Sequence, residues 1–142
     1  MPLDFLSQMR ELEDGYLSDL KEMVNIDCGT ETKSGVDAVG DMMRRHFTSI
    51  GAEIQTFPQA QYGDCLLGVV RGSGDARIFM IGHLDTVYPV GTAAARPMRR
   101  EGSRLLGPGV CDMKDGLLAG IYALRLLQAA GWDDFAEIPG VI

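Results

Sequence analysis

Long apolar runs and basic clusters are both missing from this sequence of 142 residues. No stretch approaches the roughly 18 apolar residues of a membrane-spanning helix, and residues 1–5 lack the basic and then apolar regions of a signal peptide. Basic residues form only short pairs such as Arg44-Arg45, and the formal net charge is −7. We therefore expect a cytoplasmic protein that binds neither nucleic acid nor an anionic membrane surface.

Cysteines at short spacing are also absent. The three cysteines, Cys28, Cys65 and Cys111, are widely spaced and form no CxxC pair. An odd number at wide spacing predicts neither a disulfide framework nor a zinc site built from thiolates. We expect reduced thiols that are mostly buried.

The length and the hydrophobic content of 46% allow one domain with a core, but not two such domains. The sequence contains no internal repeat, no low-complexity tract and no linker. We therefore treat residues 1–142 as one structural unit.

Apolar residues recur at helical spacing in two segments of the N-terminal half. The first segment predicts a helix over residues 4–25, which Gly15 weakens slightly. The second predicts a helix that begins at Ser34, whose hydroxyl caps backbone donors while Asp37 completes a capping box, and that ends at Gly51. The apolar stripes are Phe5, Met9, Leu12, Tyr16, Leu20 and Val24 in the first helix, and Val36, Val39, Met43, Phe47 and Ile50 in the second.

Strands are predicted over residues 52–57, residues 65–70 and the apolar run 78–81. Four consecutive large apolar residues favour a strand buried on both faces, as in the middle of a largely parallel sheet. A third helix follows later in the chain, is apolar around most of its circumference, and closes at Gly131. We expect this helix to pack on the sheet.

Two polar residues, His83 and Asp85, end the apolar run and point to the same side in extended geometry. Ligands bind beyond the carboxyl ends of strands in such sheets, so one residue could hold a metal while the other orients it. The irregular residues 86–110 then lead to Asp112 at the start of the third helix; a connection this long is usually functional or disordered. Taken singly, Asp112 is a helix N-cap and His83 a satisfied polar group. The joint arrangement favours a metal site.

Two segments carry a resemblance to a known family. They are residues 82–87, GHLDTV, and residues 107–116, GPGVCDMKDG. Together with residues 25–30 and the helix start at 35–37, they resemble the signatures of the M20-type zinc exopeptidases, the glutamate carboxypeptidase, deacetylase and desuccinylase group. The resemblance extends from the first helix to about Gly131. It implies an α/β fold, the N-terminal part of a mixed, mostly parallel sheet flanked by helices.

The resemblance also implies a site with two zinc ions. By this resemblance, His83 binds one zinc ion, Asp112 bridges the two, and Asp85 is the catalytic partner that orients His83 or polarises the centre. Such a pair of ions lowers the pKa of a shared water and polarises the substrate carbonyl. The implied activity is hydrolysis of an amide bond in a small peptide or an N-acyl amino acid, of the carboxypeptidase or N-deacylase type.

The number of matching ligands is too small for that site. Two zinc ions that share one carboxylate need about five ligating residues, and only His83 and Asp112 match the family. Glu137 matches no motif position and receives no role. We therefore expect residues 1–142 to be the N-terminal part of a catalytic domain, without its C-terminal part and dimerisation domain, and to have little or no activity. The resemblance gives no expectation for the oligomeric state.

Two further features depart from the family. Asp115 replaces the usual glycine, which adds charge and bulk near Asp112 and could alter metal binding. The tail from about Trp132 diverges as well, and Pro139-Gly140 is a poor start for a buried strand. An incomplete sheet would leave an apolar edge and an uncovered face, so we expect poor solubility or partial unfolding.

Other interpretations of the polar residues stay open. Cys111, beside a helix N-terminus, could act as the nucleophile of a cysteine hydrolase with His83 as its base. The chain could instead be a non-catalytic fragment that binds metal weakly. His46 lies at the edge of the second apolar stripe, and we interpret it as a boundary residue and not a ligand. Lys114 and the arginines at 96, 99 and 100 could meet a substrate carboxylate, although solvated charge is the simpler interpretation.

Overall fold

The computed structural model describes residues 4–142. Residues 1–3, part of the N-terminal segment 1–5 that lacks the features of a signal peptide, lie outside the described residues. The elements are α1 (Phe5–Val24), α2 (Lys33–Ser49), β1 (Glu53–Phe57), β2 (Cys65–Arg71), β3 (Met80–Ile81), α3 (Thr92–Ala95), β4 (Arg99–Glu101), β5 (Arg104–Leu106), the short turn η1 (Val110–Lys114), α4 (Asp115–Ala129) and β6 (Glu137–Val141). Over the described part of the chain, no helix has the length and apolar character needed to cross a bilayer.

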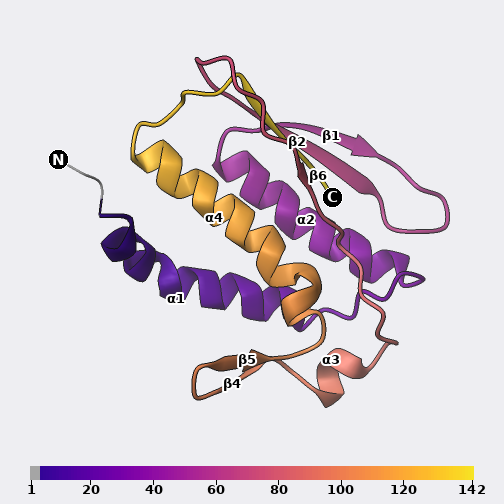
Figure 1. Ribbon diagram of the computed structural model, residues 1–142. Helices are drawn as coiled ribbons and strands as arrows, with labels where there is room; N and C mark the ends of the chain where they lie inside the picture. Colours follow the sequence, from indigo (N-terminus) through magenta and orange to yellow (C-terminus); the bar gives the residue numbers. More distant parts are fainter. Residues whose placement is uncertain (1–3) are drawn as a thin grey trace.

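A mixed sheet with the strand order β1-β2-β6-β3 forms one layer of the molecule. Strand β2 pairs antiparallel with β1 and with β6, and β3 pairs parallel with β6. The three long helices form the other layer, while α3 and the β4–β5 hairpin lie together at one end (Figure 1). The expected mixed sheet with flanking helices is confirmed, but two of its three pairings are antiparallel and not mostly parallel.

The core lies between this sheet and helices α2 and α4. Phe47 of α2 packs against Gly68 and Gly140, which are partners on neighbouring strands. A Cβ atom on Gly68 would lie 2.5 Å from the Phe47 ring, so only glycine permits this approach. On the same face, Met80 of β3 lies against Gly120 of α4. The predicted packing of the third helix on the sheet is therefore observed.

The apolar run 78–81 is not buried on both faces, so that prediction was wrong. Ile78, Phe79 and Ile81 are 46%, 60% and 72% exposed, and only Met80–Ile81 form a regular strand. The physical reason is position, because β3 lies at the edge of the sheet and the helices cover one face of it. The apolar edge expected from an incomplete sheet is present.

Strand β6 corrects a second prediction. Pro139 and Gly140 lie in an inner strand between β2 and β3, although their sequence argued against a buried strand. Gly140 suits this position because Phe47 packs directly over it. The tail therefore supplies the strand that joins β2 to β3.

The bounds of α1 and the end of α2 agree with the sequence, but the start of α2 does not. Helix α1 covers nearly the predicted range, and Gly51 follows α2 with the positive φ of a C-terminal stop. The residue before α2 is Thr32, which makes no side-chain cap, and the predicted cap Ser34 lies inside the helix. Asp37 accepts a hydrogen bond from the Asp64 backbone N–H (2.8 Å), which takes the carboxylate away from a capping box.

The cysteine prediction was wrong in part. All three thiols are free, but Cys65 and Cys111 are exposed and only Cys28 is buried.

Residues 86–110 contain α3 and the β4–β5 hairpin, so this connection is ordered. Asp27 holds it in place by accepting backbone hydrogen bonds from Gly91 (2.7 Å) and Ala93 (2.8 Å).

Candidate functional site

His83 and Asp85 follow directly after β3, at the edge of the sheet. A Cβ atom on Gly82 would lie 2.7 Å from Leu117, so glycine allows the strand to leave the sheet close to α4. The next residues are fixed by Thr86, whose backbone N–H donates to the Cys28 carbonyl at 2.8 Å. The segment after α1 therefore acts as a support for this part of the site.

Asp112 comes from a different part of the chain, the turn η1 before α4. Its backbone is extended (φ −133°, ψ 95°), and the helix begins three residues later at Asp115. The N-cap interpretation of Asp112 is therefore wrong. Lys114 fastens the turn, because its Nζ donates to the backbone carbonyls of Met23 (2.9 Å) and Ile26 (3.1 Å) at the end of α1.

Lys114 is only 1% exposed, which contradicts its interpretation as a solvated or substrate-binding charge. A buried ammonium is costly unless hydrogen bonds satisfy it. Here it meets carbonyls at the C-terminal end of a helix, where the helix dipole favours a cation. The arginines at 96, 99 and 100 are exposed, in agreement with solvated charge.

The segment after β3 and the turn η1 meet at the His83 ring. Nε2 of His83 lies 2.9 Å from Oδ1 of Asp112, and Nδ1 lies 3.1 Å from Oδ1 of Asp85. The side chains are 45%, 86% and 31% exposed for His83, Asp112 and Asp85. They line a cavity of about 200 Å³ together with residues of the 86–110 segment. The structure thus brings together the three residues that the sequence singled out.

The electrostatics of this ring favour a positive charge. Partial burial lowers the pKa of His83, but hydrogen bonds to Asp112 and Asp85 outweigh it, so the net pKa is raised. An imidazole between two carboxylates holds a proton more tightly than a free imidazole does. A metal ion at Nε2 would satisfy the same negative surroundings in place of that proton.

Thr30 lies in the segment 25–30 that shares the family resemblance, but its role in the site was not predicted. Its hydroxyl donates to Oδ2 of Asp85, on the carboxylate that contacts His83. Thr30 lies 55 residues before Asp85 in the sequence. The backbone bridge that joins Gly29 to Thr86 brings it there, and no local pattern predicts that bridge.

Other candidate groups lie outside this arrangement. Both ring nitrogens of His83 face carboxylates, so its contacts do not pair it with Cys111 as a cysteine hydrolase requires. Glu137 forms ion pairs with Arg71 (2.8 Å) and Arg77 (3.1 Å) at the start of β6. Within residues 4–142, no group of three or more histidine, cysteine or acidic side chains is placed to hold a metal ion.

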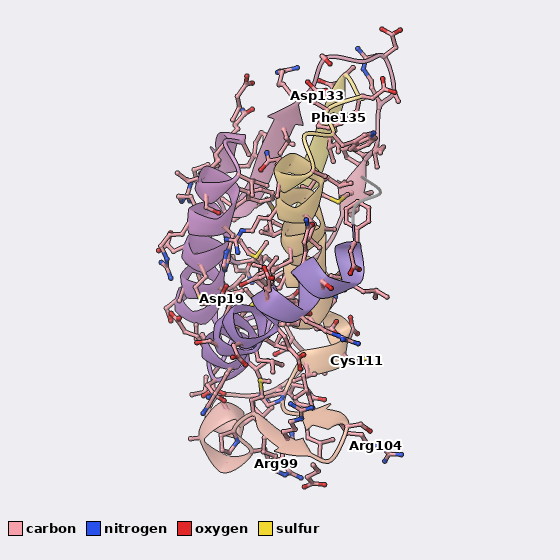
Figure 2. The ribbon with its side chains drawn as sticks, turned by 90° about the vertical axis from the view of Figure 1, so that its left-hand side faces the viewer. Asp19, Arg99, Arg104, Cys111, Asp133 and Phe135 are labelled. Carbon is pink, nitrogen blue, oxygen red and sulfur yellow. The ribbon has the colours of Figure 1, made fainter. Side chains whose placement is uncertain are left out.

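The side-chain view places this region in the molecule. Figure 2 shows Cys111 between the helices and the hairpin that carries Arg99 and Arg104. Asp133 and Phe135 lie at the opposite end. A substitution at Asp133 is therefore remote from the candidate site.

Comparison with known proteins gives a consistent picture. A model of peptidase family M20/M25/M40 matches residues 79–137. Carboxypeptidase G2 from Pseudomonas sp. (strain RS-16) is 32% identical over 128 residues, covering 89% of this chain and 31% of the relative. Beta-Ala-Xaa dipeptidase from Lactobacillus delbrueckii subsp. lactis is 30% identical over 152 residues, covering 100% of this chain and 32% of the relative. The chain thus spans about a third of the length of these curated relatives.

Solved structures share the fold. Human carnosine dipeptidase 1 superimposes with a TM-score of 0.81 at 20% identity, over 96% of this chain and 33% of that one. An M20 family metallo-carboxypeptidase from Sulfolobus solfataricus gives a TM-score of 0.72 at 15% identity, over 89% of this chain and 30% of that one. The arrangement of helices and mixed sheet is therefore that of M20 peptidase structures.

Proposed function

We propose, from the match of residues 79–137 to the model of peptidase family M20/M25/M40, that His83 and Asp112 are metal ligands of an amide-bond hydrolase. Asp85 orients His83 and acts on the reaction through it. The observation that carries the proposal is the contact of 2.9 Å between Nε2 of His83 and Oδ1 of Asp112, with a second carboxylate on the other ring nitrogen.

The donor atoms fit zinc. Zinc in proteins is bound by imidazole nitrogen and carboxylate oxygen, and a ligating histidine commonly donates its other N–H to a carboxylate. Asp85 and His83 have this second relationship. Asp112 is 86% exposed, so its carboxylate would be accessible from the solvent side to hold metal.

The chain's own residues prepare the site in three ways. Asp85 holds the proton on Nδ1 of His83 and so keeps Nε2 free to bind. Lys114 fixes the turn that carries Asp112. The cavity of about 200 Å³ beside these groups can accept a small substrate. Zinc bound at such a site lowers the pKa of a water molecule and polarises an amide carbonyl.

The proposed substrates are small peptides or N-acyl amino acids. The two curated relatives are named as a carboxypeptidase and a dipeptidase, and both names describe cleavage of amide bonds. Two ligands are fewer than the roughly five that a pair of zinc ions requires. We therefore infer that the 142-residue chain, measured alone, binds zinc weakly and turns substrate over slowly if at all.

Isothermal titration calorimetry with zinc chloride tests the ligand assignment. The heat of binding should disappear in His83→Ala and in Asp112→Asn, because each change removes one of two ligands. Asp133→Asn is the matched control, since it makes the same chemical change at the far end of the molecule (Figure 2). Binding that persists unchanged in both ligand variants would remove the proposal.

A further inference from the structure

The hydroxyl of Thr30 holds the carboxylate that contacts His83. Oγ1 of Thr30 donates to Oδ2 of Asp85, and Oδ1 of the same carboxylate lies 3.1 Å from Nδ1 of His83. We propose that Thr30 is a positioning residue. By holding Asp85, it favours the His83 tautomer with the proton on Nδ1 and the lone pair on Nε2, the nitrogen that faces Asp112. Its consequence for metal binding rests on the proposed function.

The tautomer follows from the acceptors around Nδ1. This nitrogen lies 3.1 Å from the Asp85 carboxylate and 3.1 Å from the Asp85 backbone carbonyl. Both are hydrogen-bond acceptors, whereas Nε2 faces a single acceptor, Oδ1 of Asp112 at 2.9 Å, on a side chain that is 86% exposed. Two acceptors at Nδ1 against one exposed acceptor at Nε2 favour the proton on Nδ1 when the ring is neutral. In the neutral ring the lone pair is then on Nε2, the nitrogen that faces Asp112.

Thr30 can hold the carboxylate because its own backbone is fixed. Its N–H donates to the Thr86 carbonyl at 3.1 Å, and the Thr86 N–H donates to the Cys28 carbonyl at 2.8 Å. A Cβ atom on Gly29 would lie 2.5 Å from the carbonyl oxygen of Tyr88, so glycine permits this close approach. The loop between α1 and α2 is thereby attached to the chain that follows β3.

Removing the hydroxyl frees one oxygen of the carboxylate. Asp85 can then rotate about its side-chain bonds and spend part of the time turned away from Nδ1. The fraction of His83 with the proton on Nε2 should rise, and that tautomer has no lone pair for a metal. Residues that hydrogen-bond to a ligating histidine contribute about 10- to 100-fold to metal affinity. We expect the lower value, about tenfold, for Thr30, because it contacts Asp85 and not His83 itself.

Three variants separate the hydroxyl from the shape of the side chain. Thr30→Val keeps the shape and removes the hydroxyl, Thr30→Ser keeps the hydroxyl, and Thr56→Val removes a hydroxyl bonded to Arg44 elsewhere. The tautomer is measured in the zinc-free 142-residue protein by long-range nitrogen-15 correlation NMR, at a pH where the ring is neutral. His46 serves as the internal reference in the same spectrum.

The wild type, Thr30→Ser and Thr56→Val should show His83 protonated on Nδ1, and Thr30→Val should shift it towards protonation on Nε2. Zinc titration should show affinity about tenfold weaker in Thr30→Val alone. Thr30 is exposed, so the fold should survive; Thr30→Ala is a second hydroxyl-free variant if Thr30→Val melts early. An unchanged tautomer in a folded hydroxyl-free variant overturns the inference. A wild type that binds no zinc overturns the proposed function instead, while the zinc-free spectra still decide the role of Thr30.

Discussion

The two histidines of this chain occupy opposite surroundings. His46 is 9% exposed and lies between helices: its Nδ1 is 3.0 Å from Nη2 of Arg125 on α4, and its Nε2 is 3.7 Å from Asp19 on α1. His83 is on a loop, 45% of its side chain is exposed, and both ring nitrogens face carboxylates. The same side chain is thus a helix-packing group in one place and a candidate ligand in the other.

Charge accounts for the difference. A guanidinium only donates, so the contact of Arg125 with Nδ1 requires a lone pair there and a neutral His46 ring. Burial, the largest cause, lowers the pKa of His46 although Asp19 opposes it. At His83 the carboxylates prevail and raise the pKa. Whether a histidine can attract a cation therefore depends on the groups that its position brings to the ring.

The largest expected contrast is in stabilisation by zinc. A ligand present at about 100 times its dissociation constant stabilises the folded state by about 2.7 kcal/mol. Zinc should therefore raise the melting temperature of the wild type and of His46→Gln, but not that of His83→Gln. Differential scanning fluorimetry with and without EDTA measures the effect. Stabilisation that is lost in His46→Gln and kept in His83→Gln would reverse the comparison.

The next contrast is in the unfolding of the metal-free protein. His46→Ala leaves Arg125 without its ring acceptor and opens a gap between three helices, so we expect a loss of about 2 kcal/mol. His83→Ala is exposed and should change the free energy of unfolding by less than about 0.5 kcal/mol. Urea denaturation followed by circular dichroism distinguishes the two. Equal losses would mean that both histidines serve the fold.

Tyr122 tests the network around His46 more finely. Its hydroxyl donates to Asp19 at 2.7 Å, and Arg125 lies over its ring at 4.6 Å from the centroid. Tyr122→Phe keeps the ring and removes one hydrogen bond, which should cost about 1 kcal/mol. Tyr88→Phe is the control, because Arg96 also lies over that ring, at 5.1 Å. A Tyr122→Phe protein as stable as the control would argue against a structural role for this network.

The smallest effect is on the pH dependence of stability, where the two histidines have opposite signs. The pKa of His46 is lowered by folding, so its contribution is present above pH 6.5 and is lost as the pH falls through the folded-state pKa. The pKa of His83 is raised, so its contribution is present below pH 6.5 and is lost as the pH rises through the folded-state pKa. We therefore expect that, between pH 5 and 8, the difference in unfolding free energy between wild type and His46→Gln grows as the pH rises. The difference between wild type and His83→Gln should shrink as the pH rises. Changes in the same direction would contradict these surroundings.

Local patterns in the sequence predicted the helices and the motif residues. They did not predict features that depend on contacts between distant parts of the chain. Periodicity located α1 and α2, because one apolar stripe defines a helix wherever it packs. Apolar character at 78–81 could not distinguish an inner strand from an edge strand, since the neighbour of β3 is the distant β6. Pro139 and Gly140 were misjudged because their fit depends on Phe47 of α2.

The residues of the candidate site also fall into two groups, those that the sequence predicted and those that it did not. His83, Asp85 and Asp112 were found from spacing and resemblance to a family. The roles of Thr30 and Lys114 were not predicted, because each acts through a partner more than 50 residues away in the sequence. Their contacts involve the end of α1 and the segment 25–30 that follows it, and these contacts cannot be predicted from the sequence of that segment.

A crystal structure of the protein soaked in zinc chloride, with the anomalous signal recorded at the zinc edge, tests the ligand assignment most directly. We predict a peak at about 2.0–2.1 Å from Nε2 of His83 and at about 2.0–2.2 Å from a carboxylate oxygen of Asp112, the distances of zinc to these donors. A peak at His46 or at a cysteine, with none at His83, would contradict the account.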